Sequence, residues 1–257
     1  EMSLRMSAMT IASSAPWRLA AAASLLALAA GLEAETRAGG PPELGRLPPV
    51  WPSQFYAKVT QVTTVPGLKN WTFSGEYYYD FEAGGNLWIS HYGQMEPQCI
   101  EVYPASEGKE CHTISTNWNG FHVIVPEDHL CCHWGRDELN TPVNPDWLVR
   151  MHATFVGFKM VNGVRCEGWR ADGGNRNLYY ATADDRRLPC QLYMGDTVTP
   201  TGVEQTFGME TTFDLGSIKI GVADHTLFDL PSWCDLKEVC DYAWGPTAAP
   251  TSREILV

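Results

Sequence analysis

The most reactive group of side chains in this sequence is Cys131-Cys132-His133, with His129 close by. Zinc binding is one possible chemistry, but structural zinc sites usually space their cysteines as C-x₂₋₄-C, and that spacing does not occur here. A Cys–His nucleophile is another. Because neighbours on a strand point to opposite faces, Cys132 and His133 would not meet. We therefore favour disulfide bonding over metal binding or catalysis.

Two groups of oxygen-bearing side chains are further candidates for catalysis or metal binding. Asp184-Asp185 could act as an acid/base pair, yet Arg186-Arg187 follows at once, which is typical of a solvated turn. Asp172, Asn175 and Asn177 could bind calcium, but the stretch lacks the fuller acidic spacing of a calcium loop. A hairpin turn is the better interpretation of each.

Enzyme motifs are absent from the sequence. There is no G-x-S-x-G elbow, no H-E-x-x-H helix and no phosphate-cradling glycine loop, and the seven histidines are scattered. We therefore predict no catalytic residue, no metal and no cofactor.

The cysteines are even in number, and in an oxidising compartment that favours disulfides. Cys131 and Cys132 are adjacent, so each should pair with a different partner. All eight are predicted to be disulfide-bonded: Cys99, Cys111, Cys131, Cys132, Cys166, Cys190, Cys234 and Cys240.

The first 34 residues have the pattern of a secretory signal peptide, with Arg18 before an apolar run over 19–31 and small residues near a cleavage site. That run is shorter than the roughly 20 residues of a spanning helix, so the mature form is expected not to span a membrane. Its location should be extracellular or the lumen of the secretory or lysosomal system, with a plastid lumen as the alternative. The predicted divisions are 1–34 signal peptide, 35–50 Pro/Gly-rich linker, 51–244 one disulfide-stapled β domain, and 245–257 flexible tail.

The formal net charge of −12 argues against nucleic acid and anionic membranes as partners, because both recruit Lys and Arg. An acidic, solvated surface is sufficient to explain it. Asn70-Trp71-Thr72 is an N-x-T sequon, so Asn70 is a candidate glycosylation site.

Alternating large apolar residues predict strands. Over 71–80 the alternation places Trp71, Phe73, Tyr77 and Tyr79 on one face. Asn162-Gly163, between two apolar runs, predicts a two-residue hairpin turn. That turn would put Phe155, Gly157, Lys159 and Val161 on one face and Val156, Phe158 and Met160 on the other. Further strand candidates are 55–65, 87–92, 98–103, 121–125, 176–182, 188–194, 203–213 and 217–222.

Helix signals are few. Asn144 as N-cap, Pro145 in the first turn and an apolar stripe of Trp147, Leu148 and Met151 predict one short helix. A capping-box pattern at Ser232 and Asp235 predicts a second, with Leu236, Val239 and Cys240 buried. The fold class expected is mainly β: a curved antiparallel sheet, folded over as a half-barrel, with one or two short helices.

The chain is rich in aromatic residues, with 10 Trp, 10 Tyr and 9 Phe. They could fill a packed core, or line an apolar groove if the sheet is open on one side. We select Trp71, Phe73, Tyr77 and Tyr79 as candidate ligand-binding residues.

Several segments resemble known secreted proteins. Trp51-Pro52-Ser53-Gln54-Phe55 resembles the opening of an uncharacterised secreted plant and algal family, which continues in 145–148, Gly157, 161–163, Cys166, Trp169, 178–180, Pro189 and 193–195. Segments 203–207, 218–222 and 228–234 resemble ependymin-related proteins. The early cysteine of ependymins has no counterpart, so no disulfide pairing is carried over.

That resemblance implies a folded-over sheet with a deep apolar cavity, similar to the sheet of LolA-type lipoprotein carriers. It also implies a secreted or lysosomal glycoprotein that binds lipids and calcium. The function expected is a non-catalytic binding protein that holds a lipid-like ligand in a β groove. The first alternative is an extracellular-matrix or lumenal complex subunit, with an interaction or structural role, a filled core and a possible protein partner. The second is an enzyme of unknown type.

Overall fold

The chain divides into two units, residues 1–41 and 42–257. The structure, a computed structural model, describes parts of the second unit: residues 46–64, 70–91, 99, 102–103, 106, 108–134, 142–173, 175–199, 202–221 and 224–240. For residues 197–199 and 202–207 the structure describes only the backbone. Outside the described residues lie the predicted signal peptide, most of the predicted linker and the whole of the predicted tail.

One antiparallel sheet of 12 strands contains most of the described chain, which confirms the mainly β prediction. Strands β1 to β6 form one meander and β7 to β11 another, in the order β6-β5-β4-β3-β2-β1-β11-β10-β9-β8-β7, and β12 also pairs with β1. Their bounds are β1 Gln54–Thr64, β2 Trp71–Asp80, β3 Gly85–Ser90, β4 Cys111–Thr116, β5 Gly120–Val125, β6 Leu130–His133, β7 Thr154–Val161, β8 Val164–Asp172, β9 Asn175–Thr182, β10 Pro189–Thr199, β11 Gly202–Phe213 and β12 Lys219–Ile220.

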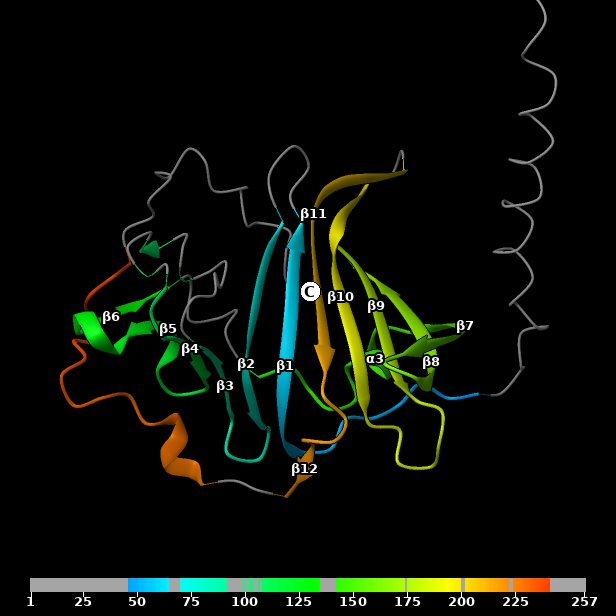
Figure 1. Ribbon diagram of the computed structural model, residues 1–257, viewed down its shortest axis with the longest axis horizontal. Helices are drawn as coiled ribbons and strands as arrows, with labels where there is room; N and C mark the ends of the chain where they lie inside the picture. The colour runs from blue at the N-terminus through cyan, green and yellow to red at the C-terminus, as the bar shows by residue number, and fades with distance from the viewer. Residues whose placement is uncertain are drawn as a thin grey trace, which may run out of the picture. The chain divides into compact units, whose positions relative to one another are not determined.

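The two meanders are joined by the pairing of the first strand with the eleventh, which lie side by side in Figure 1. Val59 on β1 is opposite Phe213 on β11, and the register continues to Thr64 opposite Gly208. The other edge of β1 pairs with β2 along almost its whole length. The centre of the sheet is therefore built from segments about 150 residues apart in the chain.

Side chains of β1 alternate between a buried and a more exposed face, as the strand period requires. We call the face with Phe55, Ala57 and Val59 the core face, and the face with Lys58 and Thr60 the groove face. The core face carries a continuous aromatic cluster that includes Trp169, Tyr179 and Phe213, covered by Trp51 and by Leu148 from the helix α3 (Trp147–Arg150).

The β7–β8 hairpin has the predicted turn, with φ of 48° at Asn162 and 80° at Gly163. The predicted faces are wrong for its far end, because a bulge lies between Phe155 and Gly157. A bulge adds one residue and resets the alternation. Phe155 and Phe158, predicted to be on opposite faces, therefore pack together with ring centroids 5.3 Å apart.

The helix predicted around Trp147 is present, but its cap is different. Asp146 is the N-cap residue and uses no side-chain cap bond, while Asn144 accepts from the backbone N–H of Asp146 at 3.4 Å. Leu148 is fully buried and Trp147 packs beside it, as predicted.

The second predicted helix does not form. Residues 231–240 make turns, with Cys234 N–H bonded to the Pro231 carbonyl and Glu238 N–H to that of Asp235. Two disulfides and a parallel bridge between His133 and Val239 hold this segment against β6. Anchoring at both ends sets its path, so Val239 is exposed and not buried as predicted. The described residues also include 3₁₀ turns at η2 (Pro126–Asp128) and η4 (His225–Phe228).

Most other predicted strands correspond to β1, β3, β5, β9, β10, β11 and β12, within a few residues at their ends. The prediction for 98–103 is wrong where the structure describes it, since Cys99 and Val102 have helical backbone and Tyr103 N–H bonds to the Cys99 carbonyl. Strands β4 and β6 were not predicted.

All eight cysteines form disulfides, and Cys131 and Cys132 have different partners, as predicted. The pairs are Cys99–Cys111, Cys131–Cys234, Cys132–Cys240 and Cys166–Cys190. Since the sulfurs of Cys131 and Cys132 are bonded to other sulfurs, they are not available as zinc ligands or as a nucleophile.

Candidate functional site

The four aromatic residues selected from the sequence lie on the core face. Phe73, Tyr77 and Tyr79 are buried, and Trp71 is half-buried at the start of β2. Tyr77 stacks on Trp88 with ring centroids 4.2 Å apart, and Tyr79 donates a hydrogen bond to the Val143 carbonyl at 2.5 Å. Neither of the two cavities described below is lined by any of the four.

The larger cavity is a groove of about 810 Å³ on the groove face. One wall is formed by the central strands β1, β2 and β11, and it includes Thr60 and Ser74. The other is the tip of the β7–β8 hairpin, at Asn162 and Val164. Residues far apart in the sheet order therefore face one another across this groove.

The sheet reaches this arrangement by curling toward the groove face. Neighbouring strands lie about 4.8 Å apart, so β7 and β10, three strands apart, would be separated by roughly 14 Å in a flat sheet. Yet Lys159 on β7 donates a hydrogen bond to Gln191 on β10. Val161 on β7 packs in one cluster with Cys190 on β10 and with Leu215. Contacts this short require a strongly bent sheet.

Apolar side chains line much of the groove. Val62 projects from β1, Val161 and Val164 from the hairpin, and Leu215 from the turn after β11. Val164 is partly exposed. Because apolar surface that stays in contact with water is costly, these side chains favour an apolar occupant.

Ionisable side chains complete the lining at Lys58, Glu76, His91 and Asp214. Glu76 accepts a 2.6 Å hydrogen bond from the Tyr78 hydroxyl and lies 3.8 Å from His91 Nε2. Burial and then this hydrogen bond to Glu76 raise the pKa of Tyr78 well above its ordinary value, so its hydroxyl stays protonated at neutral pH.

Lys58 is opposite Glu76 in the β1–β2 register, and its ammonium makes no ion pair within 4.0 Å with the described residues. Apolar walls with a cation and anions at one end suit an amphipathic ligand better than a purely apolar one. Sequence reasoning missed Lys58 as a site residue, because its alternation indicated only a solvated face.

The other sequence candidates have structural roles. Asp184 accepts hydrogen bonds from Thr182 at 2.6 Å and from Arg186 at 2.9 Å within a turn, as predicted. Asp172 pairs with Arg170 at the end of β8, beside the β8–β9 turn. Asn70 is exposed just before β2, and its glycosylation stays a prediction.

Within the part of the chain that the structure describes, no group of three or more His, Cys, Asp or Glu side chains is placed to hold a metal ion. Among those same residues, no helix has both the length and the apolar character needed to span a membrane.

No protein-family model matches the chain, and no curated protein matches its sequence. Among solved structures it is similar to a LolA superfamily protein of Nitrosomonas europaea, with 9% identity and a TM-score of 0.34 over 72% of this chain and 92% of that one. It is also similar to a DUF1329 family protein of Desulfovibrio piger, with 10% identity and a TM-score of 0.32 over 69% and 90%.

A third similar structure is the lipoprotein LppX of Mycobacterium tuberculosis, with 7% identity and a TM-score of 0.30 over 62% of this chain and 84% of that one. A LolA superfamily protein is thus among the similar structures, whereas the ependymin-related resemblance and the plant and algal family stay predictions. Likeness at this level carries nothing about a ligand.

Proposed function

We propose that this chain is a non-catalytic binding protein that holds the apolar part of a lipid-like ligand in the groove between β1, β2 and the β7–β8 tip. The observation that carries the proposal is the cavity itself. Its volume of about 810 Å³ lies within the roughly 300 to 1,000 Å³ of small-molecule sites, and valines line its two walls. The four disulfides suit a secreted or lumenal protein.

The groove can be tested by blocking it. Val164→Trp would fill the cavity from the hairpin tip, and Met160→Trp places the same side chain on an exposed position of the same hairpin that does not line the cavity. We expect delipidated protein to bind a fluorescent fatty-acid probe, Val164→Trp to weaken binding about tenfold or more, and Met160→Trp to leave it unchanged. If the delipidated wild type binds no probe, or if both variants bind equally well, the proposal is wrong.

A second candidate function, a subunit that binds a protein partner, is favoured by one edge of the sheet. The β6 edge is covered, since His133 exchanges backbone hydrogen bonds with Glu238 and Cys240. Strand β7 has no second partner strand among the described residues, and its Val156 and Met160 are exposed. An uncovered edge can accept a strand from another chain. Introducing Pro at Val156 should abolish such pairing in a co-purification experiment while leaving probe binding intact.

A further inference from the structure

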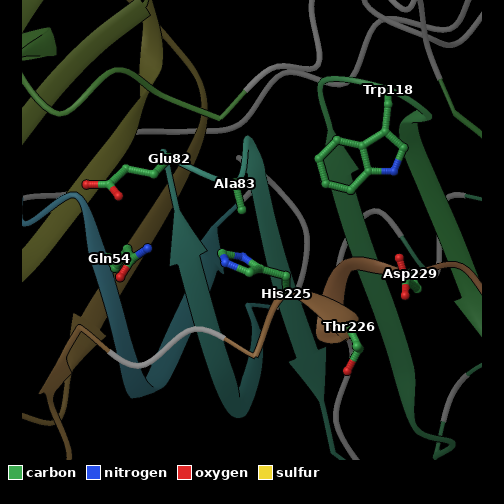
Figure 2. A pocket seen from close by; sticks show the side chains of 7 residues that line it. All are labelled: Gln54, Glu82, Ala83, Trp118, His225, Thr226 and Asp229. Carbon is green, nitrogen blue, oxygen red and sulfur yellow. The ribbon is translucent and has the colours of Figure 1, made fainter.

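A second cavity, of about 480 Å³, lies at the sheet end where β1 begins, and it is separate from the groove. Its lining comes from four segments of the chain: Gln54 at the start of β1, Glu82 in the β2–β3 turn, Trp118 in the β4–β5 turn, and η4 with its flanking residues. Figure 2 shows His225 between Gln54 and Glu82 on one side and Trp118 on the other.

A buried carboxylate organises this cavity. Asp80 is 1% exposed and accepts hydrogen bonds from Gln54 Nε2 at 3.2 Å and from the Ala83 N–H at 2.8 Å. Its Oδ2 also lies 3.3 Å from His225 Nδ1. Because Asp80 is used internally, its role is to orient Gln54 and His225. The Nε2 atom of His225 is left on the far side of the ring from Asp80.

The surrounding turns are held in place independently of any ligand. Asp224 caps η4 by accepting from the Thr226 N–H at 3.1 Å. Phe228 is buried against Gly85, where an added Cβ would approach Phe228 Cγ to 2.6 Å. Asn117 N–H bonds to the Gly84 carbonyl, which ties the Trp118 turn to the Glu82 turn. The cavity walls are therefore preorganised, which reduces the entropic cost of binding.

The lining chemistry narrows the class of ligand. Among the described residues, the lining includes the carboxylates of Glu82 and Asp229 and no Lys or Arg, so an anionic ligand is disfavoured. The remaining polar groups are an amide, a hydroxyl and an imidazole. A ligand hydroxyl both donates and accepts, so it suits carboxylate oxygens and either state of the imidazole.

The side chain of Trp118 adds an apolar surface to these polar groups. Trp118 is 51% exposed and lines the cavity together with several polar side chains. An indole in such a place offers a flat apolar surface beside hydrogen-bonding groups, which matches the apolar C–H face and hydroxyl rim of a sugar ring. We infer that this cavity is a saccharide-binding site in which Trp118 stacks on a sugar ring while Glu82, Asp229 and the Asp80-oriented His225 bind its hydroxyls.

The test uses the full mature chain and saturation-transfer difference NMR with glucose, mannose, galactose, N-acetylglucosamine, cellobiose and maltose, and with choline as an organic cation. Trp233 is also exposed but lies outside the cavity, beside His129, so Trp233→Ala is the matched control for Trp118→Ala. We expect at least one saccharide to bind, Trp118→Ala and His225→Ala to weaken it about tenfold or more, and Trp233→Ala to leave it unchanged.

Circular dichroism of each variant separates lost binding from lost folding, and Trp118, being exposed, should be replaceable without unfolding. The inference is overturned if no saccharide binds, if Trp118→Ala binds as well as the wild type, or if choline binds and the saccharides do not. Blocking the groove with Val164→Trp should not change saccharide binding.

Discussion

The ammonium group of Lys159 on β7 donates a hydrogen bond to Gln191 Oε1 on β10, although β8 and β9 lie between these strands. Gln191 in turn donates to Thr212 on β11 at 3.0 Å, and the Lys159 ammonium lies 4.4 Å from the Tyr180 ring centroid. This chain of contacts holds the curl that brings the hairpin tip opposite the central strands. The groove exists because the sheet is bent where these side chains meet.

The groove end at Lys58 should select the head group of a ligand. We expect Lys58→Ala to weaken binding of oleate about tenfold. The Lys58 ammonium would lie beside the oleate carboxylate, and such a pair contributes about 1–2 kcal/mol to binding when it is partly shielded from water. Binding of methyl oleate, which has no charge, should change little. Competition against the fluorescent probe measures both. Equal losses for the acid and the ester would show that Lys58 acts only through its methylenes.

Core-face aromatics should behave differently from groove residues. Tyr77 is buried among Phe55, Trp88 and Phe213, so Tyr77→Ala should destabilise the protein by about 3–5 kcal/mol. Urea unfolding gives the free energy, and probe binding is measured under conditions where the variant stays folded. A variant that is fully stable but has lost probe binding would indicate that the ligand binds on the core face and not in the groove.

Removing disulfides should have unequal effects on stability. Cys132–Cys240 joins residues 108 apart and Cys99–Cys111 joins residues 12 apart. In the chain-entropy model the longer loop contributes about 4–5 kcal/mol and the shorter about 3. Because Cys131–Cys234 closes almost the same long loop, removing Cys132–Cys240 alone would leave that loop closed. Ser substitutions that remove both long-range bridges together should therefore lower the melting temperature more than paired Ser substitutions at Cys99 and Cys111, as measured by thermal unfolding. Thiol counting in denaturant should find no free sulfhydryl, and two or more would contradict the pairing.

Glu167 should be a strong stability determinant. Its carboxylate is 3% exposed and binds both Arg46 and Arg187, each of which is itself partly exposed. We expect Glu167→Gln to destabilise the protein by about 1–3 kcal/mol, less than for a fully buried pair because solvent screens the two cations. Asp184→Asn, which breaks an exposed pair with Arg186, is the control and should cost under about 1 kcal/mol. Equal small effects would argue against a structural role for Glu167.

Stability should fall in alkaline solution. Burial raises the pKa of Tyr77, Tyr79 and Tyr179 well above the ordinary value of 10.0. The unfolded chain releases these protons near pH 10, whereas the folded chain retains them, so the free energy of unfolding decreases as pH rises above about 10. Absorbance at 295 nm should show that these tyrosines ionise only together with unfolding. Smooth titration of all tyrosines in the folded protein would contradict this expectation.

Local features of the fold follow from the sequence. Asn162-Gly163 forms the turn because both residues have positive φ, which Asn and Gly tolerate best. The alternation over β2 predicted which side chains are buried together, and the even cysteine count predicted full pairing. Each of these depends on neighbours in the chain or on composition, so no long-range contact is needed to predict it.

The site depends on contacts that the sequence does not display. A single bulge at Val156 reverses the faces predicted for the start of β7, at Thr154 and Phe155, and no local pattern marks it. Alternation assigned Phe73 and Tyr77 to one face, but whether that face holds a packed core or a groove depends on what covers it. Here Trp51 and Leu148 cover it, and the curl toward Lys159 and Gln191 opens the groove on the opposite face.

What the sequence by itself determined was therefore the strand alternation, the hairpin turn and the number of disulfides. Only the tertiary structure decided the pairing of β1 with β11, the direction of the curl and the meeting of Gln54, Trp118 and His225 at one cavity. The physical reason is that backbone preferences act over a few residues, whereas bending and cavity formation depend on packing between segments more than 100 residues apart.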